Sequence, residues 1–570
     1  MKELRRFIRI SEPPVIFIYL MLFVFLIFNL LVIIKSFLFL FVIDEIVIKM
    51  NFGILKDWLI VFLSTTISHI ITGFYYDYFL EIFRNRIRFN LYSKIYNHII
   101  HLPIDYFKKT NSGYLAGRII TDIEQLDNNL FENIFVFFGS IFTFLSACFV
   151  GFVISWQITT ILLLFQPFYF LLILRFSRKT KELSSEFQEN KANFTKSLQE
   201  NFSGVYDIKT FNYEKRSLDK IKKILKRFSD SVQDFHIFSS FYSDTTGGIL
   251  TLFISILFYG FGVYLIFKGL FTVGSFTAFS IIVPRITGPI SGLANLNVSF
   301  QIVKVSIERI REFIDKEVED LKTGDKIEDI NEIRFEDVSF SYDDKTILKN
   351  INFSINRGEI IGIVGKTGAG KTTLINLILK IITPEKGKIY IGGKEIRSIN
   401  TEILRKKIGI IPQNIFIFNL PLIENLKIGN PDANDEEVKN VISLVLLDDL
   451  IKKFPEGYST LLGEKGFNLS GGEIVRIGIA RAIIKKPDVI IIDEALSQVD
   501  SKTESIIWGS IREIFRDKIV IIIAHRLSTI KNCDKIILLK DGKIAGIGKH
   551  KELFEKSIDY QELYKEQVIT

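Results

Sequence analysis

Hydrophobic and polar positions divide the chain into two parts with different patterns. Up to about residue 300, long apolar runs alternate with basic polar stretches, and after about residue 330, short apolar runs alternate with glycine and mixed charge. An α-helix needs about 20 apolar residues to cross a hydrocarbon core of ~30 Å. Six runs have this character, at residues 15–34 (continuing to 43), 59–79, 130–154, 158–174, 248–267 and 271–293. We therefore predict a six-helix membrane domain followed by a soluble domain.

The distribution of Lys and Arg predicts the orientation of the membrane domain. Both are frequent before the first run, between the second and third, and between the fourth and fifth, whereas the other connections hold only Lys49, Lys56 and Lys268. Cytoplasmic loops carry the excess of positive charge. Both termini and the soluble domain are therefore expected in the cytoplasm, at an inner or plasma membrane. Most of the net charge of +8 comes from the Lys and Arg of these cytoplasmic segments, so no nucleic-acid partner is predicted.

Two further features of the membrane part concern its cytoplasmic side. Residues 1–12 alternate apolar and basic positions, which predicts an amphipathic helix on the membrane surface. The long cytoplasmic connections contain almost no Pro or Gly, so the spans are expected to continue as helices well beyond the bilayer. A helix from Leu59 to His101 would be roughly 60 Å long.

The soluble part begins with strand patterns and a glycine-rich loop. Strands are predicted at residues 333–340, 346–355 and 360–364, and the third is continuously apolar, as is typical of a buried parallel strand. It leads into the phosphate-loop pattern GxxxxGK[ST], whose backbone N–H groups and following helix N-terminus bind phosphate. This loop consists of Gly365, Lys366, Thr367, Gly368, Ala369, Gly370, Lys371, Thr372 and Thr373. We expect Lys371 to reach the β- and γ-phosphates and Thr372 to bind Mg²⁺.

Two more apolar strands end in residues with catalytic side chains. Residues 489–492 run into Asp493 and Glu494, and residues 520–524 run into His525. Two cysteines exclude a disulfide scaffold and a Cys-rich zinc module, and six scattered histidines argue against a His-based metal site. Asp493 is predicted to bind Mg²⁺, and Glu494 to act as general base toward water. His525 is predicted to contact the γ-phosphate.

A second glycine-rich turn precedes an apolar helical run at residues 474–484. The turn contains Ser470, Gly471, Gly472 and Glu473, and it predicts a second anion site at a helix N-terminus. One nucleotide has no need of two such sites in one domain. We infer that the domain acts as two copies, and that this second anion site of each copy contacts the nucleotide bound to the other copy.

Together these residues resemble the ATP-binding cassette (ABC) family, with Walker A at 365–373, Walker B at 489–493 and the family signature at 469–473. The resemblance implies that Gln413 is the Q-loop residue at the metal and catalytic site, and that Tyr342 stacks on adenine. It also implies that Asp500 belongs to a D-loop and that His525 is the switch histidine. Residues 101–122 resemble the first coupling helix and its flanks, and residues 204–214 resemble the stretch that leads to the second. Because the motifs occur in family order, the whole chain resembles an exporter-type half-transporter.

The chain departs from the family pattern at a few positions. Glu473 replaces the usual Gln of the signature, and Leu496, Gln498 and Val499 replace the usual residues around the D-loop. None of these changes removes a phosphate, metal or water contact. One chain type can thus build two complete sites, which favours a homodimer over a heterodimer without excluding the latter.

The predicted fold is an all-α membrane domain plus an α/β P-loop cassette. The expected boundaries are an interfacial helix at 1–12, the membrane domain with its long cytoplasmic helices at 13–315, a linker at 316–331 and the cassette at 332–570. The predicted function is ATP-driven export of an amphipathic substrate, a lipid, drug or peptide, by alternating access in a dimer. An ATP-gated channel or regulator, and an importer built on the same fold, are the alternatives.

Two charges lie inside the predicted spans, Lys35 in the first and Arg285 in the sixth. Intramembrane charge is costly unless it faces protein or water. Lys35 lies roughly 30 Å above Pro14, which favours snorkelling to the interface. Arg285 lies between Pro284 and Pro289, and its own span contains no carboxylate. We expect it to line the transport cavity and to favour substrates with an anionic head group.

Overall fold

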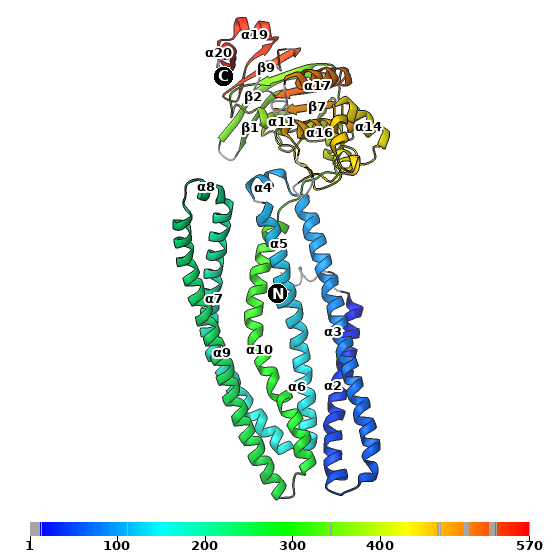
Figure 1. Ribbon diagram of the computed structural model, residues 1–570, viewed down its shortest axis with the longest axis vertical. Helices are drawn as coiled ribbons and strands as arrows, with labels where there is room; N and C mark the ends of the chain where they lie inside the picture. The colour runs from blue at the N-terminus through cyan, green and yellow to red at the C-terminus, as the bar shows by residue number, and fades with distance from the viewer. Residues whose placement is uncertain are drawn as a thin grey trace. The chain divides into compact units, whose positions relative to one another are not determined.

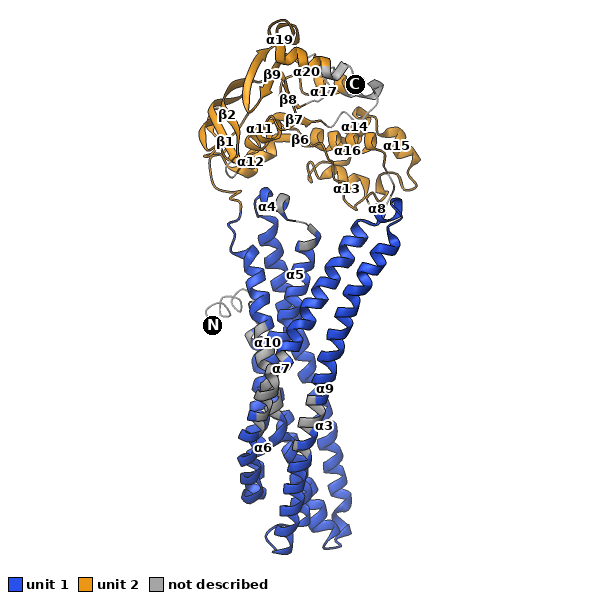
Figure 2. Ribbon diagram, turned by 90° about the vertical axis from the view of Figure 1, so that its left-hand side faces the viewer, with its two compact units in different colours: residues 1–318 blue, residues 319–570 orange. Residues whose placement is uncertain are grey.

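We describe the chain from a computed structural model. It describes residues 12, 14–110, 112–342, 345–463, 467, 469–494, 501–523, 530, 531 and 533–568. The interfacial helix predicted for residues 1–12 therefore lies outside the described residues except for Glu12. The chain forms two compact units, Met1–Val318 and Glu319–Thr570 (Figure 2).

The first unit is entirely helical, and each of the six predicted apolar runs falls on one of its long helices. These are α2 (Val15–Phe41, continued by the π-helical turn η1, Val42–Val47), α3 (Leu55–Ile100), α6 (Glu132–Ile154), α7 (Trp156–Ser203), α9 (Glu214–Phe267) and α10 (Val273–Ile314). Shorter elements join them: η2 (Phe52–Ile54), α4 (Ile104–Lys109), α5 (Ser112–Leu126), η3 (Asp127–Phe131) and α8 (Val205–Thr210). The predicted all-α membrane domain is confirmed.

Length and composition mark the segments that suit a bilayer. Among the described residues, Ile16–Val47, Phe52–Ile100 and Leu115–Ile154 are long and apolar enough to cross a membrane, and Leu252–Phe267 and Val273–Gly288 are shorter apolar stretches. The most apolar window of Phe52–Ile100 contains no buried residue. An apolar helix surface that the protein does not cover requires lipid around it.

Beyond the apolar segments, the helices continue as a packed helical extension. Helix α3 has 46 residues and is therefore about 69 Å long. Its second half buries Phe83, Ile87, Leu91, Ile95 and Ile99, one residue per turn on a single face. Helix α7 ends at Gly204, and the short helices α4 and α8 lie at the same end of the bundle (Figure 1).

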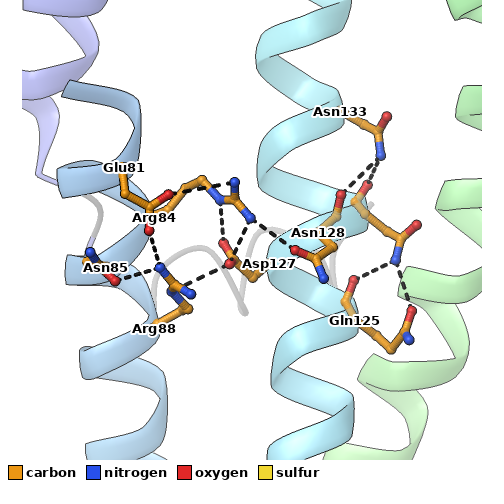
Figure 3. A network of polar contacts seen from close by, with 9 residues as sticks. Glu81, Arg84, Asn85, Arg88, Gln125, Asp127, Asn128 and Asn133 are labelled. Carbon is orange, nitrogen blue, oxygen red and sulfur yellow. Dashed lines mark hydrogen bonds and ion pairs between the residues drawn. The ribbon is translucent and has the colours of Figure 1, made fainter. Parts of the chain in front are cut away.

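A polar network joins α3 to η3 in this extension (Figure 3). The carboxylate of Asp127 is nearly buried and accepts two hydrogen bonds from Arg84, at 3.1 and 3.0 Å. Arg88 lies 3.5 Å from the same carboxylate and also pairs with Glu81. Arg84 donates a further hydrogen bond to Asn128. Buried charge is tolerated here because each group has opposite charge or hydrogen-bond partners.

The second unit contains two sheets, and an apolar core covers each face of the larger one. One of these cores also includes residues of the smaller sheet, so it joins the two sheets. The antiparallel sheet has the order β2-β1-β4-β5, and the larger sheet has the order β10-β9-β3-β8-β7-β6. In the larger sheet β9, β3, β8, β7 and β6 are parallel, so their carboxyl ends lie along one edge. The strands are β1 (Glu332–Tyr342), β2 (Lys345–Asn356), β3 (Ile360–Val364), β4 (Lys386–Ile391), β5 (Lys394–Glu395), β6 (Ile408–Ile411), β7 (Val489–Asp493), β8 (Ile519–Ile523), β9 (Lys535–Lys540) and β10 (Lys543–Gly548).

Helices cover the parallel sheet, and one of them, α11, follows the glycine-rich loop directly. They are α11 (Lys371–Ile378), α12 (Thr401–Lys407), α13 (Leu422–Lys427), α14 (Asp435–Leu444), α15 (Asp448–Lys453), η4 (Gly457–Ser459), α16 (Gly471–Ile484), α17 (Ser501–Ile514), α19 (His550–Lys556) and α20 (Ile558–Val568). The predicted α/β P-loop class is confirmed. The strands predicted at 333–340 and 346–355 are β1 and β2, which pair antiparallel in the smaller sheet.

Candidate functional site

The glycine-rich loop connects β3 to α11 in the strand–loop–helix order that the sequence predicts. Gly370 is the residue before α11 and has φ 105°, a left-handed conformation that favours glycine. At Gly365 a Cβ atom would lie 2.4 Å from the carbonyl oxygen of Leu539. These glycines allow the backbone to turn sharply and pack closely before the helix begins.

Lys371 is buried, with 7% of its surface exposed, and its Nζ donates a 2.7 Å hydrogen bond to the carbonyl oxygen of Gly365. Burial lowers the pKa of Lys371, and the charges of Glu494 and Asp493 partly oppose that shift. The ammonium group is therefore held inside the loop, under the influence of both carboxylates. The neighbouring Thr372 is exposed, so its hydroxyl is open to a ligand.

The carboxylates and Gln413 converge from the ends of neighbouring strands. Asp493 is the last residue of β7, and Glu494 follows it with φ 52°. The Glu494 N–H donates to the carbonyl oxygen of Ile523 on β8. Gln413 lies just after β6 and donates from Nε2 to Glu494 Oε2 at 2.9 Å. Residues from two separate motifs thus meet at the carboxyl edge of the sheet, where open α/β folds bind ligands.

The second glycine-rich turn lies at the start of α16, a helix that packs on β6. Ser470 is exposed at this N-terminus, and its N–H donates to the Glu473 carboxylate at 2.7 Å. A Gln at position 473 would supply the same acceptor atom. The substitution therefore preserves the capping geometry and adds a negative charge at a helix N-terminus, which the helix dipole favours.

Among the other predicted site residues, the structure describes Tyr342 but not His525 or the D-loop. Tyr342 ends β1 and packs edge-on against Phe340, with ring centroids 4.9 Å apart. His525 and the D-loop residues Leu496, Gln498, Val499 and Asp500 lie outside the described residues, so their roles stay predictions.

Arg481 positions a segment beside the site, and the sequence reasoning did not identify it. It projects from α16 and donates to the carbonyl oxygens of Asn425 and Phe416, each at 2.7 Å, and to Asn425 Oδ1. Asn425 is fully buried and holds Phe418 through its side chain. Burial lowers the pKa of Arg481 to about 10. The sequence signal was two Arg residues, Arg476 and Arg481, in the apolar run of α16. Arg481 fixes the segment that follows Gln413.

The residues present suit a phosphate ligand with a divalent cation. Positive groups come from the backbone N–H groups of the glycine-rich loop, the buried Lys371 and the N-terminus of α11. Thr372 and Asp493 provide oxygen ligands. Among the described residues no three His, Cys, Asp or Glu side chains cluster as a complete metal site. Mg²⁺ usually binds through one or two protein groups plus substrate phosphates, so this sparse set fits it.

Comparisons with known proteins agree with this arrangement. The profile of the ABC transporter transmembrane region matches residues 16–290, and that of the ABC transporter domain matches residues 348–497. The chain is 30% identical over 535 residues to an ATP-dependent lipid A-core flippase of Syntrophus aciditrophicus (strain SB), covering 92% of this chain and 88% of the flippase. It is 32% identical over 497 residues to a putative multidrug export ATP-binding/permease protein of Staphylococcus aureus (strain bovine RF122 / ET3-1), covering 85% and 84%.

The fold has a counterpart among solved structures. A bacterial Atm1-family ABC exporter with ATP bound superposes with a TM-score of 0.82 at 22% sequence identity, covering 97% of this chain and 98% of that one. At this identity the likeness concerns the fold alone. The sequence relatives and both domain profiles lead to one conclusion: this chain belongs to the ABC transporter family and joins an exporter-type membrane domain to an ATPase cassette.

Proposed function

We propose that this protein is an ATP-driven exporter of an amphipathic substrate. The observation that carries the proposal is the convergence of Lys371, Asp493, Glu494 and Gln413 at one sheet edge, in a chain that also contains an exporter-type membrane domain. The names of the two relatives, a lipid A-core flippase and a multidrug export protein, support an amphipathic substrate.

Each site residue has a proposed role in ATP hydrolysis. The phosphate loop 365–373 and Lys371 bind the phosphates, and Tyr342 stacks on adenine. Thr372, Asp493 and Gln413 would hold Mg²⁺, which when bound neutralises developing phosphate charge. Glu494 accepts a proton from the attacking water, and Gln413 fixes the orientation of the Glu494 carboxylate. His525 and Asp500 complete the site in this proposal.

A second half-transporter completes the site and forms the transporter, and we propose that it is a second copy of this chain. The turn at Ser470, Gly471, Gly472 and Glu473 would contact the nucleotide held by the Lys371 of the other copy. ATP binding would close the cassettes, and hydrolysis would reset them.

The membrane placement follows from family and charge. The chain is a multi-pass membrane protein, and we propose that it lies in the inner or plasma membrane with both termini and the cassette in the cytoplasm. The concentration of Lys and Arg in alternate connections supports this orientation.

Transport in reconstituted vesicles tests the proposal. Vesicles with outward-facing cassettes receive external ATP and a fluorescent amphiphile. An exporter moves the amphiphile into the lumen with ATP, and an importer removes it from the lumen. A channel lets it equilibrate without ATP turnover. ATP-dependent movement toward the lumen supports the proposal, and either other result overturns it.

A further inference from the structure

The chain between α10 and the cassette offers little slack. Helix α10 ends at Ile314, and the second compact unit begins at Glu319. Residues 315–318 between them are all exposed. Four residues of fully extended chain span at most about 14 Å. A larger displacement of the α10 end would therefore pull directly on Glu319.

The residues that follow Glu319 are fixed against the segment before α12. The Asp325 N–H donates to the carbonyl oxygen of Ser398 at 2.6 Å, and the Asn400 N–H donates to the carbonyl oxygen of Asp325 at 2.9 Å. Gly324 has φ 115°, and a Cβ atom there would lie 2.5 Å from the Ser398 carbonyl oxygen. Glycine permits this close approach of the two backbones. This part of the connection is therefore built into the cassette and does not act as a loose tether.

An ion pair between Glu319 and Arg405 of α12 anchors the start of this segment. Arg405 donates from Nη1 to Glu319 Oε2 at 3.0 Å and from Nη2 to Glu319 Oε1. The Arg405 and Glu319 side chains are 27% and 20% exposed, so the pair is largely buried. Two parallel hydrogen bonds between planar groups fix both the position and the orientation of the partners. A pull on Glu319 is therefore transmitted to α12.

Arg405 also contacts the end of helix α11, which begins at Lys371 of the phosphate loop. Its Nε donates to the carbonyl oxygen of Leu379, and its Nη2 to that of Lys380, each at 3.1 Å. Leu379 follows α11 directly. One guanidinium group thus joins the connection from α10, helix α12 and the helix of the phosphate loop. These partners compensate for the cost of burying its charge.

Helix α12 leads from Arg405 to the proposed catalytic site. It ends at Lys407, β6 begins at the next residue, and Gln413 lies two residues beyond the end of β6. Strand β6 is at the edge of the parallel sheet and pairs with β7, which leads into Glu494. The hydrogen bond from Gln413 to Glu494 is 2.9 Å long, and hydrogen bonds weaken steeply away from good geometry. A small shift of β6 along β7 would therefore change how the Glu494 carboxylate is held.

We propose that Glu319 and Arg405 are positioning residues that transmit a displacement of the α10 end to Gln413, and so couple the membrane unit to ATP hydrolysis. This inference rests on the proposed function and adds a route through the covalent connection of the two units. Because coupling is reciprocal, nucleotide binding at the phosphate loop acts on the end of α10 by the same route.

Hydrogen–deuterium exchange of the full-length protein in nanodiscs tests the inference, with Mg²⁺ and a non-hydrolysable ATP analogue present or absent. In the wild type the analogue should slow exchange in the phosphate loop, residues 365–373, and change exchange at the α10 end, residues 303–318. Glu319→Gln should reduce the change at residues 303–318 about twofold or more and leave the protection of the phosphate loop as it is. Lys406→Gln is the matched control, because Lys406 lies on α12 in an exposed pair with Glu402.

A longer connection provides a second test that leaves the ion pair intact. Four Gly and Ser residues inserted between Lys316 and Glu317 lie in an exposed segment and add slack. This insertion should reduce the response at residues 303–318 as much as Glu319→Gln does. The two changes combined should do no more than either alone, because they interrupt one route.

Several outcomes would overturn the inference. In the wild type, it fails if residues 303–318 do not respond although the analogue protects the phosphate loop. It also fails if Glu319→Gln keeps the full response, if Lys406→Gln loses as much, or if the losses from Glu319→Gln and the insertion add. A full response with the longer connection refutes it even where Glu319→Gln does not fold.

Transport in vesicles separates this inference from the proposed function. Glu319→Gln should lower the number of amphiphile molecules moved per ATP hydrolysed about twofold or more, whereas a merely structural defect would lower transport and hydrolysis together. A wild type that hydrolyses ATP without moving the amphiphile contradicts the proposed function alone. A wild-type ratio of transport to hydrolysis in Glu319→Gln contradicts the coupling route alone.

Discussion

Replacing Glu494 by Gln tests the proposed chemistry at the atom where it occurs. The Glu494 carboxylate accepts a 2.9 Å hydrogen bond from Gln413 Nε2. The oxygen of the substituted amide accepts the same bond, and the amide is isosteric with the carboxylate. The left-handed backbone of residue 494, at φ 52°, is equally accessible to Glu and Gln. The change therefore removes proton-accepting capacity and one negative charge while the local geometry stays the same.

The expected effect is large on hydrolysis and small on binding. Loss of a positioned general base slows a reaction by about 10²–10⁴-fold, or roughly 3–5 kcal/mol of activation free energy. Nucleotide affinity should not fall, because Lys371 and the loop glycines are unchanged and one repulsive charge is lost near the phosphates. ATP should therefore accumulate on the variant and hold the cassettes together.

Phosphate release in nanodiscs and retention of labelled ATP after rapid desalting measure the two effects. Glu555→Gln is the control, since Glu555 is exposed on α19 and belongs to no site described above. The control should hydrolyse ATP at the wild-type rate. If Glu494→Gln hydrolyses ATP within a factor of about three of wild type, or if it loses ATP binding, the assignment of Glu494 as general base is wrong.

Three further predictions concern other parts of the molecule. In a mixed dimer, Lys371→Ala on one chain and Ser470→Arg on the other should damage the same nucleotide site twice and leave the second site intact. Half of the nucleotide occupancy should therefore remain. Equal loss at both sites would show that each cassette acts alone. Glu473→Gln removes a negative charge beside the partner's nucleotide and keeps the oxygen that accepts the Ser470 N–H hydrogen bond. The KM for ATP should therefore fall about two- to fivefold, which corresponds to a Coulomb energy of about 0.5–1 kcal/mol. An unchanged or higher KM contradicts this prediction. Asp127→Asn removes the nearly buried carboxylate that Arg84 and Arg88 both contact and should destabilise the membrane unit by about 3 kcal/mol, seen as a lower temperature of half-inactivation in detergent. Glu81→Gln changes a half-exposed carboxylate of the same network and should cost less than about 1 kcal/mol.

Local rules allowed much of this protein to be predicted from its sequence. A bilayer imposes the length and composition of each span separately, so the six apolar runs indicated their helices without knowledge of their neighbours. The phosphate loop is equally local: a strand, a glycine turn and a helix N-terminus occupy fewer than twenty consecutive residues. Helix α10 is nevertheless continuous from Val273 to Ile314, although Pro284 and Pro289 interrupt the sixth apolar run.

Tertiary structure decided which distant residues meet. Gln413 reaches Glu494 only because β6 and β7 are adjacent parallel strands, and nothing in either motif specifies that adjacency. Arg481 holds the segment after Gln413 through contacts 56 and 65 residues away along the chain. Helices α2 and α10 pack together although they are the first and the last long helices of the membrane unit. Pairing across such separations depends on the packing of whole helices and strands, which no short window of sequence contains.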